Sequence, residues 1–270
     1  MPEKESGEER EGVYYFLCDV AIEEEVRGSL GQVREKLGEP TILINNAGMA
    51  HDWTVQSLNQ VEDLKKAGRV VDVNLLSHFY ATTWFLQHGK GARQQGTIVT
   101  VSSVLGYLGA ASLSAYSASK AASIAWHRSL TAELAITKPS IRTILVATGQ
   151  LDTEMFAHAK VQGRIQGFFA PVLGAGEVAM RIVGMIDSGR GGEVRMPFYA
   201  ESIALLAILP ASVQKGLRWW SGIDVALNSA EDLCEKPTGA RGVKSDSKDV
   251  EREHLDTSSE SLSDSDDSNL

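Results

Sequence analysis

TILINNAG, residues 41–48, is a short apolar run that ends in two asparagines and a glycine. The run has no polar side until its end, and this predicts a β-strand buried on both faces. GTIVTVSS (96–103) and IRTILVATG (141–149) repeat the pattern of an apolar run with a polar end. Residues 61–88 and 114–135 between them predict helices. Strands that alternate with helices at this spacing predict an α/β fold, with a parallel sheet and helices on both faces.

The same pattern extends in both directions along the chain. GVYYFLCDV (12–20) is rich in β-forming residues and predicts a strand, followed by a helix. Residues 175–189 predict a further helix, and GEVRMPF (192–198) predicts the last strand. In parallel sheets, ligands bind beyond the carboxyl ends of the strands. Polar residues gather at those ends, at Asp19, Asn45–Gly48, Ser102–Ser103 and Thr148–Thr153. The sequence therefore predicts a binding site along one edge of the sheet.

SAYSASK (114–120) places Tyr116 and Lys120 four residues apart, and so on one face of the predicted helix. A free tyrosine has a pKa of about 10, which a nearby cation lowers. Ser103, at the tip of the preceding strand, could hydrogen-bond the same phenol. Together these groups could donate and accept a proton for an alcohol–carbonyl pair. Taken alone, a Tyr–Lys pair is more often a surface pair in which the lysine extends over the ring.

Five motifs in order carry a more specific signal, namely CDV (18–20), NNAG (45–48), Asn74 within VDVNLLSHF, VSS (101–103) and YSASK (116–120). With these motifs the chain resembles the short-chain dehydrogenase/reductase family from about Gly12 to Phe198. Its C-terminal part resembles the retinol- and 17β-hydroxysteroid-type, lipid-handling branch. The resemblance implies a Rossmann-like, doubly wound parallel sheet. It also implies an NAD(P)-dependent oxidoreductase that interconverts an alcohol and a carbonyl on a lipophilic substrate of retinoid, steroid or fatty type.

The resemblance also implies a role for each matching residue. Four residues would be catalytic, namely Asn74, Ser103, Tyr116 and Lys120. Tyr116 would be the general acid and base, and Lys120 would lower its pKa. Ser103 would orient the carbonyl, and Asn74 would interrupt its helix and position a water in a proton relay. Seven residues would bind NAD or NADP, namely Asp19, Asn45, Ala47, Gly48, Tyr116, Lys120 and Thr153.

The family's glycine-rich phosphate turn, T-G-x-x-x-G-x-G, has no counterpart before NNAG. A β-α-β unit needs roughly 30 residues, and only the charged residues 1–12 precede the first predicted strand. The sequence therefore predicts a sheet without its first β-α-β unit, and without the residue that selects NAD or NADP. We expect this chain to bind NADH and NADPH more weakly than about millimolar, because lost phosphate contacts reduce affinity steeply. The alternative is a truncated, catalytically silent family member that acts as a binding or scaffold protein.

The chain divides by composition into a charged leader (1–12), a body (13–235) and a tail (236–270). The leader has five acidic and two basic residues and the tail nine and five, so the body carries little of the net charge of −9. The body would be a partial NAD(P)-binding Rossmann domain, and the Ser/Asp-rich acidic tail would be disordered. A nearly neutral body argues against nucleic acid as a partner. Two cysteines and no signal peptide predict a cytosol-facing protein, cytoplasmic or peripherally attached to a membrane or lipid droplet.

Two further segments suggest contacts. Residues 196–227 mix an apolar run with Lys215, Arg218 and Trp219. This composition suits either a membrane or lipid surface or a helix packed over a substrate cleft. Alanines flank the Tyr–Lys pair on its helix, which suits either a homodimer interface or close internal packing. The six histidines show no metal-ligand spacing, so no metal is predicted.

Overall fold

The computed structural model describes residues 12–50, 61–89, 95–153, 155, 172–206 and 208–221. All of these belong to one compact unit, Met1–Cys234. The tail predicted to be disordered, 236–270, lies outside the described residues, as do residues 1–11 of the predicted leader.

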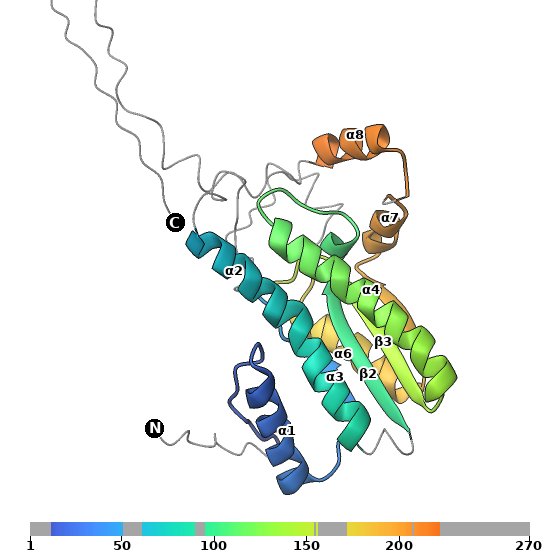
Figure 1. Ribbon diagram of the computed structural model, residues 1–270. Coiled ribbons are helices and arrows are strands. Elements are labelled where there is room, and N and C mark those ends of the chain that lie inside the picture. Colours follow the sequence, from blue (N-terminus) through green and yellow to red (C-terminus); the bar gives the residue numbers. More distant parts are fainter. Residues whose placement is uncertain are drawn as a thin grey trace, which may run out of the picture. The chain divides into compact units, whose positions relative to one another are not determined.

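Four parallel strands form the sheet, in the order β1-β2-β3-β4 (Figure 1). They are β1 (Ile42–Asn45), β2 (Gly96–Ser103), β3 (Ile141–Thr148) and β4 (Gly192–Met196). Each strand follows its neighbour both in the sequence and in the sheet, and a helix lies between each pair. This arrangement confirms the predicted α/β fold with a parallel sheet.

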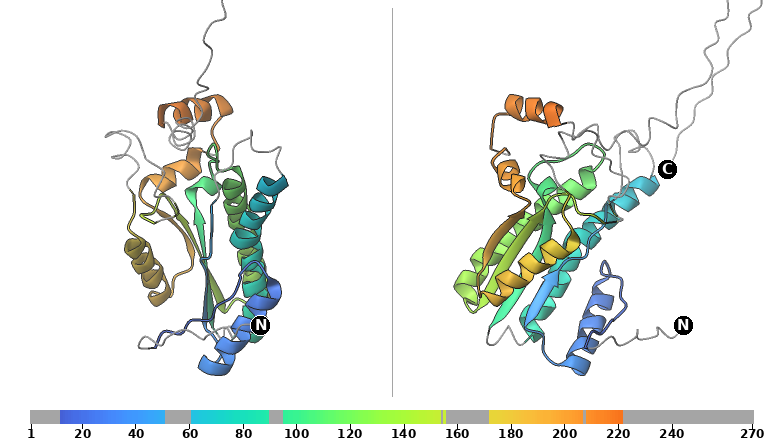
Figure 2. Two further views of the ribbon diagram at one scale, coloured as in Figure 1. Left: turned by 90° about the vertical axis from the view of Figure 1, so that its left-hand side faces the viewer. Right: turned by 180° about the vertical axis from the view of Figure 1, so that it is seen from behind.

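Helices cover both faces of the sheet (Figure 2). One face carries α2 (Val61–Val71), α3 (Ser77–His88) and α4 (Ser114–Thr137), with α1 (Glu23–Leu37) packed against α3. The other face carries α6 (Ala175–Asp187). Two further helices, α7 (Tyr199–Leu206) and α8 (Ala211–Ser221), follow β4. The sheet is therefore doubly wound, as predicted.

The core lies against both faces of the central strands. All eight residues of β2 are buried. On the α6 side, Val99 and Ile144 pack with Val178 and Ile182 of the helix. On the α3–α4 side, a second cluster is formed by Phe85, Ile98, Leu130, Leu134 and Ile141. Burial on two sides explains why β2 and β3 read as continuous apolar runs.

Two sequence expectations were wrong at the β1 side of the sheet. Residues 14–19 form no strand, and Val13 makes only an isolated bridge. β1 itself is not buried on both faces, because Ile42 and Ile44 are 42% and 47% exposed. Both results have one cause: among the described residues β1 pairs only with β2, and no helix covers this part of the α6 face. A segment with strand composition needs a neighbouring strand before it can form a ladder.

Exposed apolar side chains follow β4. The most exposed are Phe198, Leu205, Ile208 and Trp219, at 64–85%. They lie on or beside α7 and α8, the helices predicted to touch either a lipid surface or the substrate cleft. Among the described residues, no helix is both long enough and apolar enough to span a bilayer.

Candidate active site

The candidate active site lies at the carboxyl ends of β1 and β2, where α4 begins (Figure 1). Ser103 is the last residue of β2, and Tyr116 and Lys120 lie in the first two turns of α4. The Ser102 hydroxyl donates to the Lys120 carbonyl oxygen at 3.1 Å and so ties the end of β2 to the start of α4. The structure therefore brings together three of the predicted catalytic residues.

Tyr116 and Lys120 are buried side by side. Their side chains share a helix face, with the Lys120 Nζ 5.7 Å from the centroid of the Tyr116 ring. Burial raises the pKa of Tyr116, and a hydrogen bond with Ser103 opposes this rise. Burial also lowers the pKa of Lys120 to about 8. The alternative of a surface Tyr–Lys pair is wrong, because the two residues are only 6% and 5% exposed.

Lys120 has few compensating contacts for a buried ammonium. Its Nζ donates to the Val101 carbonyl oxygen at 3.2 Å, and no described carboxylate forms an ion pair with it. At neutral pH a group with a pKa of about 8 is mostly charged. The site therefore holds a cation beside a phenol, but the pKa of Tyr116 stays raised, because burial is the larger effect and only the hydrogen bond with Ser103 opposes it.

Asn74 lies in a π-helical segment, Asp72–Leu76, that interrupts the helix between α2 and α3. The predicted interruption is therefore present. The Asn74 amide accepts from the Met49 N–H at 2.7 Å and donates to the Met49 carbonyl oxygen at 2.9 Å. It also donates to the Ser119 hydroxyl at 2.9 Å. These bonds join the loop after β1 to α4.

Gly48 lies between Asn74 and Lys120. A Cβ at this position would be 3.4 Å from the Lys120 Nζ and 3.5 Å from the Asn74 Oδ1. The absence of a side chain thus leaves room where the two polar groups face the same point. A small polar molecule such as water needs such a space with several polar partners.

The residues predicted for the adenosine side are engaged with other protein groups. Asp19 forms an ion pair with Arg69 of α2 at 2.5 Å and accepts from the Ala21 N–H. The Asn45 amide donates to the Thr82 hydroxyl of α3 at 3.0 Å. Ala47 lies beside Gly48 in the loop after β1. The contacts of Asp19 and Asn45 therefore fix the protein locally, and their role toward a cofactor stays a prediction.

Thr153 lies in the loop after β3 and is exposed. Its N–H donates to the Leu151 carbonyl oxygen at 2.9 Å. Within the described part of the chain, no hydrogen bond or ion pair joins it to Tyr116 or Lys120. The structure therefore does not assemble Thr153 with the buried residues.

Sequence reasoning missed several groups at the site. Ser119 donates to the Tyr116 carbonyl oxygen and accepts from Asn74, which makes it the link between two predicted catalytic residues. His78 is 1% exposed, and burial, with a smaller contribution from Lys120, lowers its pKa to about 3. In the sequence, the only indication that His78 belongs to the site was its position one turn after Asn74. His78 therefore adds no second cation next to Lys120 at neutral pH.

Comparison with known proteins identifies the family. The family model described as short chain dehydrogenase matches residues 2–162, more than half of the chain. The chain belongs to the short-chain dehydrogenase family. Its motifs at Asn45–Gly48, Ser103 and Tyr116–Lys120 all lie inside the matched range.

Curated relatives in this family are longer than the chain. An uncharacterized oxidoreductase of Saccharomyces cerevisiae, TDA5, is 35% identical over 217 residues, which cover 78% of this chain and 64% of the relative. Retinol dehydrogenase 10-B of Danio rerio is 36% identical over 161 residues, which cover 59% of this chain and 46% of the relative. The chain thus spans less than two thirds of the length of either relative.

Solved structures of short-chain dehydrogenases share the fold. A short chain dehydrogenase of Burkholderia cenocepacia in complex with NADP is 26% identical, with a TM-score of 0.58 over 76% of each chain. A 4-hydroxyisoleucine dehydrogenase complexed with NADH has a TM-score of 0.55 at 23% identity, over 66% of this chain and 77% of that chain. The described sheet and helices are therefore those of a short-chain dehydrogenase.

Proposed function

We propose that this chain carries the active site of an NAD- or NADP-dependent oxidoreductase that interconverts an alcohol and a carbonyl. The observation that carries the proposal is the convergence of Ser103, Tyr116 and Lys120 in a buried cluster. An unpaired buried ammonium destabilises a fold, so its presence beside a phenol calls for a functional reason. Relatives of the chain include retinol dehydrogenases, and a structural neighbour holds NADP.

Tyr116 is the general acid and base in this proposal. In the reducing direction its phenol would give a proton to the carbonyl oxygen, and in the oxidising direction it would take the proton from the alcohol. Ser103, whose hydroxyl hydrogen-bonds the Tyr116 phenol and accepts from the Leu105 N–H, would also hydrogen-bond the same substrate oxygen. Lys120 would supply a positive charge beside the phenol, and such a charge favours the ionised form of a phenol. NAD or NADP would supply or accept the hydride.

Asn74 would hold a water in the space beside Gly48. The Asn74 Oδ1 and the Lys120 Nζ both border that space. A water there would connect Lys120 with the backbone of the loop after β1 and give the ammonium a path for proton exchange. Asn74 is suited to this role because Met49 and Ser119 fix its amide.

The remaining cofactor contacts are also proposals. Asp19 would contact the adenine, Asn45, Ala47 and Gly48 would line the adenosine, and Thr153 would hold the carboxamide. The described α1 begins with three glutamates, Glu23–Glu25, and its N-terminus therefore repels a pyrophosphate. α1 is the only described helix before β1, so the described residues ahead of β1 offer no other helix N-terminus to a phosphate. We therefore expect weak cofactor binding by this chain, in the millimolar range or above.

We propose a lipophilic substrate and a peripheral contact with a lipid surface. The support is the set of exposed apolar side chains on α7 and α8, of which Trp219 is 85% exposed. Lys215 lies on the same helix, and aromatic and basic residues together favour the membrane interface. Localisation on the cytosolic side of a membrane or lipid droplet would follow from this contact.

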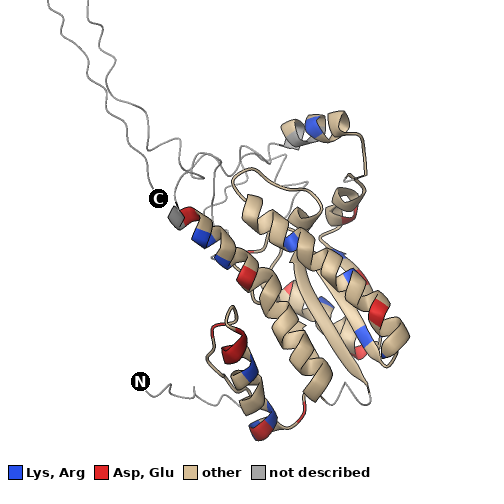
Figure 3. Cartoon of the chain, in the orientation of Figure 1, with Lys and Arg blue, Asp and Glu red and all other residues tan. Residues whose placement is uncertain are grey.

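A homodimer through α3 and α4 is also proposed. α3 carries no lysine, arginine, aspartate or glutamate (Figure 3). Its Phe79 is 41% exposed, and α4 presents Ala118, Ala121 and Ala125 to solvent. Two such helix faces can approach closely, because small side chains leave little bulk between the helix backbones.

Two substitutions test the assignment. Tyr116→Phe should abolish turnover and leave cofactor binding unchanged, because the ring stays and only the transferable proton is lost. Lys120→Ala should reduce both turnover and cofactor binding, because it would remove a contact with the cofactor ribose as well as the positive charge. Turnover is measured at several millimolar cofactor with retinoid, steroid and long-chain alcohols, and binding by saturation-transfer NMR. The matched control is Tyr80→Phe, because the Tyr80 hydroxyl makes no hydrogen bond with another described residue. Unchanged turnover in Tyr116→Phe would refute the assignment.

A catalytically silent binding or scaffold protein is the second candidate function. Among the described residues, the outer edge of β1 is unpaired and no phosphate-binding turn is present, and both observations favour this candidate. It predicts that no alcohol is oxidised at any cofactor concentration, although the fold and the dimer persist.

A further inference from the structure

The turn after Ser103 rests directly on the backbone of α4. The chain leaves β2 through a single 3₁₀ turn, Val104–Gly106, which the Ser103 hydroxyl caps by accepting from the Leu105 N–H at 3.2 Å. A Cβ on Gly106 would lie 2.6 Å from the Ile124 Cδ1 and 2.9 Å from the backbone carbonyl carbon and oxygen of Lys120. The position of this turn on α4 therefore sets where Ser103 lies relative to the two catalytic residues of the helix.

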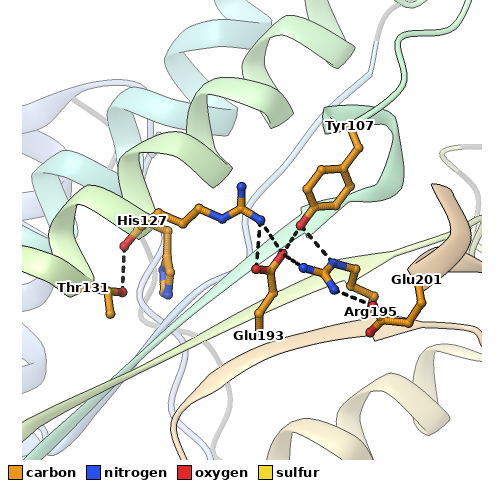
Figure 4. A network of polar contacts seen from close by, with 7 residues as sticks. Tyr107, His127, Thr131, Glu193, Arg195 and Glu201 are labelled. Atoms are coloured by element: carbon orange, nitrogen blue, oxygen red, sulfur yellow. Dashed lines mark hydrogen bonds and ion pairs between the residues drawn. The ribbon is translucent and has the colours of Figure 1, made fainter. Parts of the chain in front are cut away.

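Tyr107, the residue after this turn, lies in a network of ion pairs (Figure 4). Its hydroxyl donates to the Glu193 carboxylate of β4. The guanidinium carbons of Arg128 and Arg195 are each 5.6 Å from the centroid of the Tyr107 ring. Arg128 also pairs with Glu193 at 2.9 Å, and Arg195 pairs with Glu193 at 3.0 Å. The turn is thereby fixed to α4 through Arg128 and to β4 through Glu193 and Arg195.

The charges of this network support a fixed geometry. Arg195 also pairs with Glu201 of α7 at 2.5 Å, so two arginines are balanced by two glutamates. Burial alone would raise the pKa of Glu193, but the hydrogen bonds from Tyr107 and Arg128 outweigh it and lower the pKa. Burial and the nearby Glu193 raise the pKa of Tyr107, which therefore stays a donor at neutral pH. Charge-assisted hydrogen bonds of this kind are stronger and more directional than neutral ones.

Among the described residues of the network, only Tyr107 comes from the segment between β2 and α4, where it directly follows the turn. Arg128 and Glu193 already join α4 to β4 without it. We propose that Tyr107 is a positioning residue, which holds the Val104–Gly106 turn on α4 and so keeps the Ser103 hydroxyl against the phenol of Tyr116. The inference rests on the proposed function only for the importance of the Ser103–Tyr116 contact, and it requires no cofactor.

The contact can be observed directly by NMR. The chain is labelled with ¹³Cζ-tyrosine, whose signal responds to hydrogen bonding at the phenol oxygen, and the Tyr116 signal is assigned by its loss in Tyr116→Phe. Ser103→Ala removes the Ser103–Tyr116 hydrogen bond and defines the signal position without it. We expect Tyr107→Phe to move the Tyr116 signal at least half of the way to that position. Tyr80→Phe, the matched control, should leave it in place.

Non-additivity provides a second readout that a merely structural role would not give. In Ser103→Ala/Tyr107→Phe, the Tyr116 signal should lie where Ser103→Ala alone puts it. Glu193→Gln, which weakens the same network, should displace the signal in the direction of Tyr107→Phe. A Tyr116 signal at its wild-type position in folded Tyr107→Phe would overturn the proposal. So would loss of folded circular dichroism in both Tyr107→Phe and Glu193→Gln, because the network would then be a requirement of the fold. The measurement involves no turnover, so its failure is distinct from failure of the proposed oxidoreductase activity.

Discussion

Replacing Lys120 with methionine should make the protein more stable at neutral pH. Lys120 is 5% exposed, and its ammonium donates to one backbone carbonyl, that of Val101. Within the described residues no carboxylate pairs with it. Methionine has a similar length and fills the same space without a charge. A residue retained for catalysis at the expense of stability should show this behaviour.

The magnitude follows from the pKa of Lys120. Burial lowers this pKa from 10.5 to about 8, and each pKa unit corresponds to about 1.4 kcal/mol. Keeping the ammonium charged in the folded protein therefore costs about 3 kcal/mol at pH 7. The variant loses the hydrogen bond to Val101, which contributes about 1 kcal/mol. We expect Lys120→Met to raise the free energy of unfolding by about 2 kcal/mol at pH 7.

The gain should depend on pH in a defined window. Between pH 8 and 10.5 the unfolded chain holds a proton on this lysine that the folded chain has already released. The stability of the wild type therefore rises with pH through this window, whereas the variant lacks this contribution. The advantage of Lys120→Met should be full below pH 8, decline above it and be lost near pH 10.5. Urea unfolding followed by circular dichroism across this range measures the difference.

Lys138→Met is the matched control. The Lys138 ammonium donates to the Leu86 carbonyl oxygen at 3.1 Å from a half-buried position, so its loss should not stabilise the protein. If Lys120→Met is no more stable than the wild type at pH 7, or if its advantage is the same at every pH, the argument for a desolvated catalytic cation is wrong.

Three further substitutions test other parts of the structure by urea unfolding. Asn74→Ala should destabilise the protein by about 2–4 kcal/mol, because it breaks three hydrogen bonds of a fully buried side chain; a loss below about 1 kcal/mol would contradict this. Gly149→Ala should destabilise by about 1–3 kcal/mol, since its Cβ would overlap the Tyr199 Oη. The loss should be smaller in a Tyr199→Phe background, and equal losses would show that the clash is not with the hydroxyl. Arg69→Ala should change stability by less than about 1 kcal/mol, because its ion pair with Asp19 is partly exposed; a larger loss would mean that the pair anchors the loop before α1.

The parts of the fold that were predictable from the sequence are those governed by local pattern. β2 and β3 are buried on both sides and read as apolar runs, and the spacing of Tyr116 and Lys120 placed them on one helix face. The strand predicted over residues 12–20 is absent, because strand composition alone is not sufficient. A ladder also needs a partner strand, which no local pattern reveals. The prediction that both faces of β1 are buried was wrong for a similar reason, since nothing among the described residues covers Ile42 and Ile44.

The site was predictable only in part. The motifs identified Ser103 and the Tyr–Lys pair, whose arrangement depends on one strand end and one helix start. The Tyr107–Glu193 hydrogen bond joins residues 86 apart, and the Asp19–Arg69 pair joins residues 50 apart. Neither pair has a spacing that distinguishes it from any other Tyr–Glu or Asp–Arg pair in the sequence. Contacts of this kind follow from the packing of elements and become visible only in the folded chain.

Transfer of deuterium from an alcohol to the cofactor would show directly that this chain is an oxidoreductase. The purified chain is incubated with NAD or NADP at several millimolar and a lipophilic alcohol that carries deuterium on its carbinol carbon, and the recovered cofactor is examined by mass spectrometry. Because the product accumulates over many hours, even slow oxidation by a weakly bound cofactor can be detected. Deuterium should appear in the reduced nicotinamide with the wild type and with Tyr80→Phe, and should be absent with Tyr116→Phe. Absence of deuterium with the wild type, or equal incorporation with Tyr116→Phe, would contradict the proposed function.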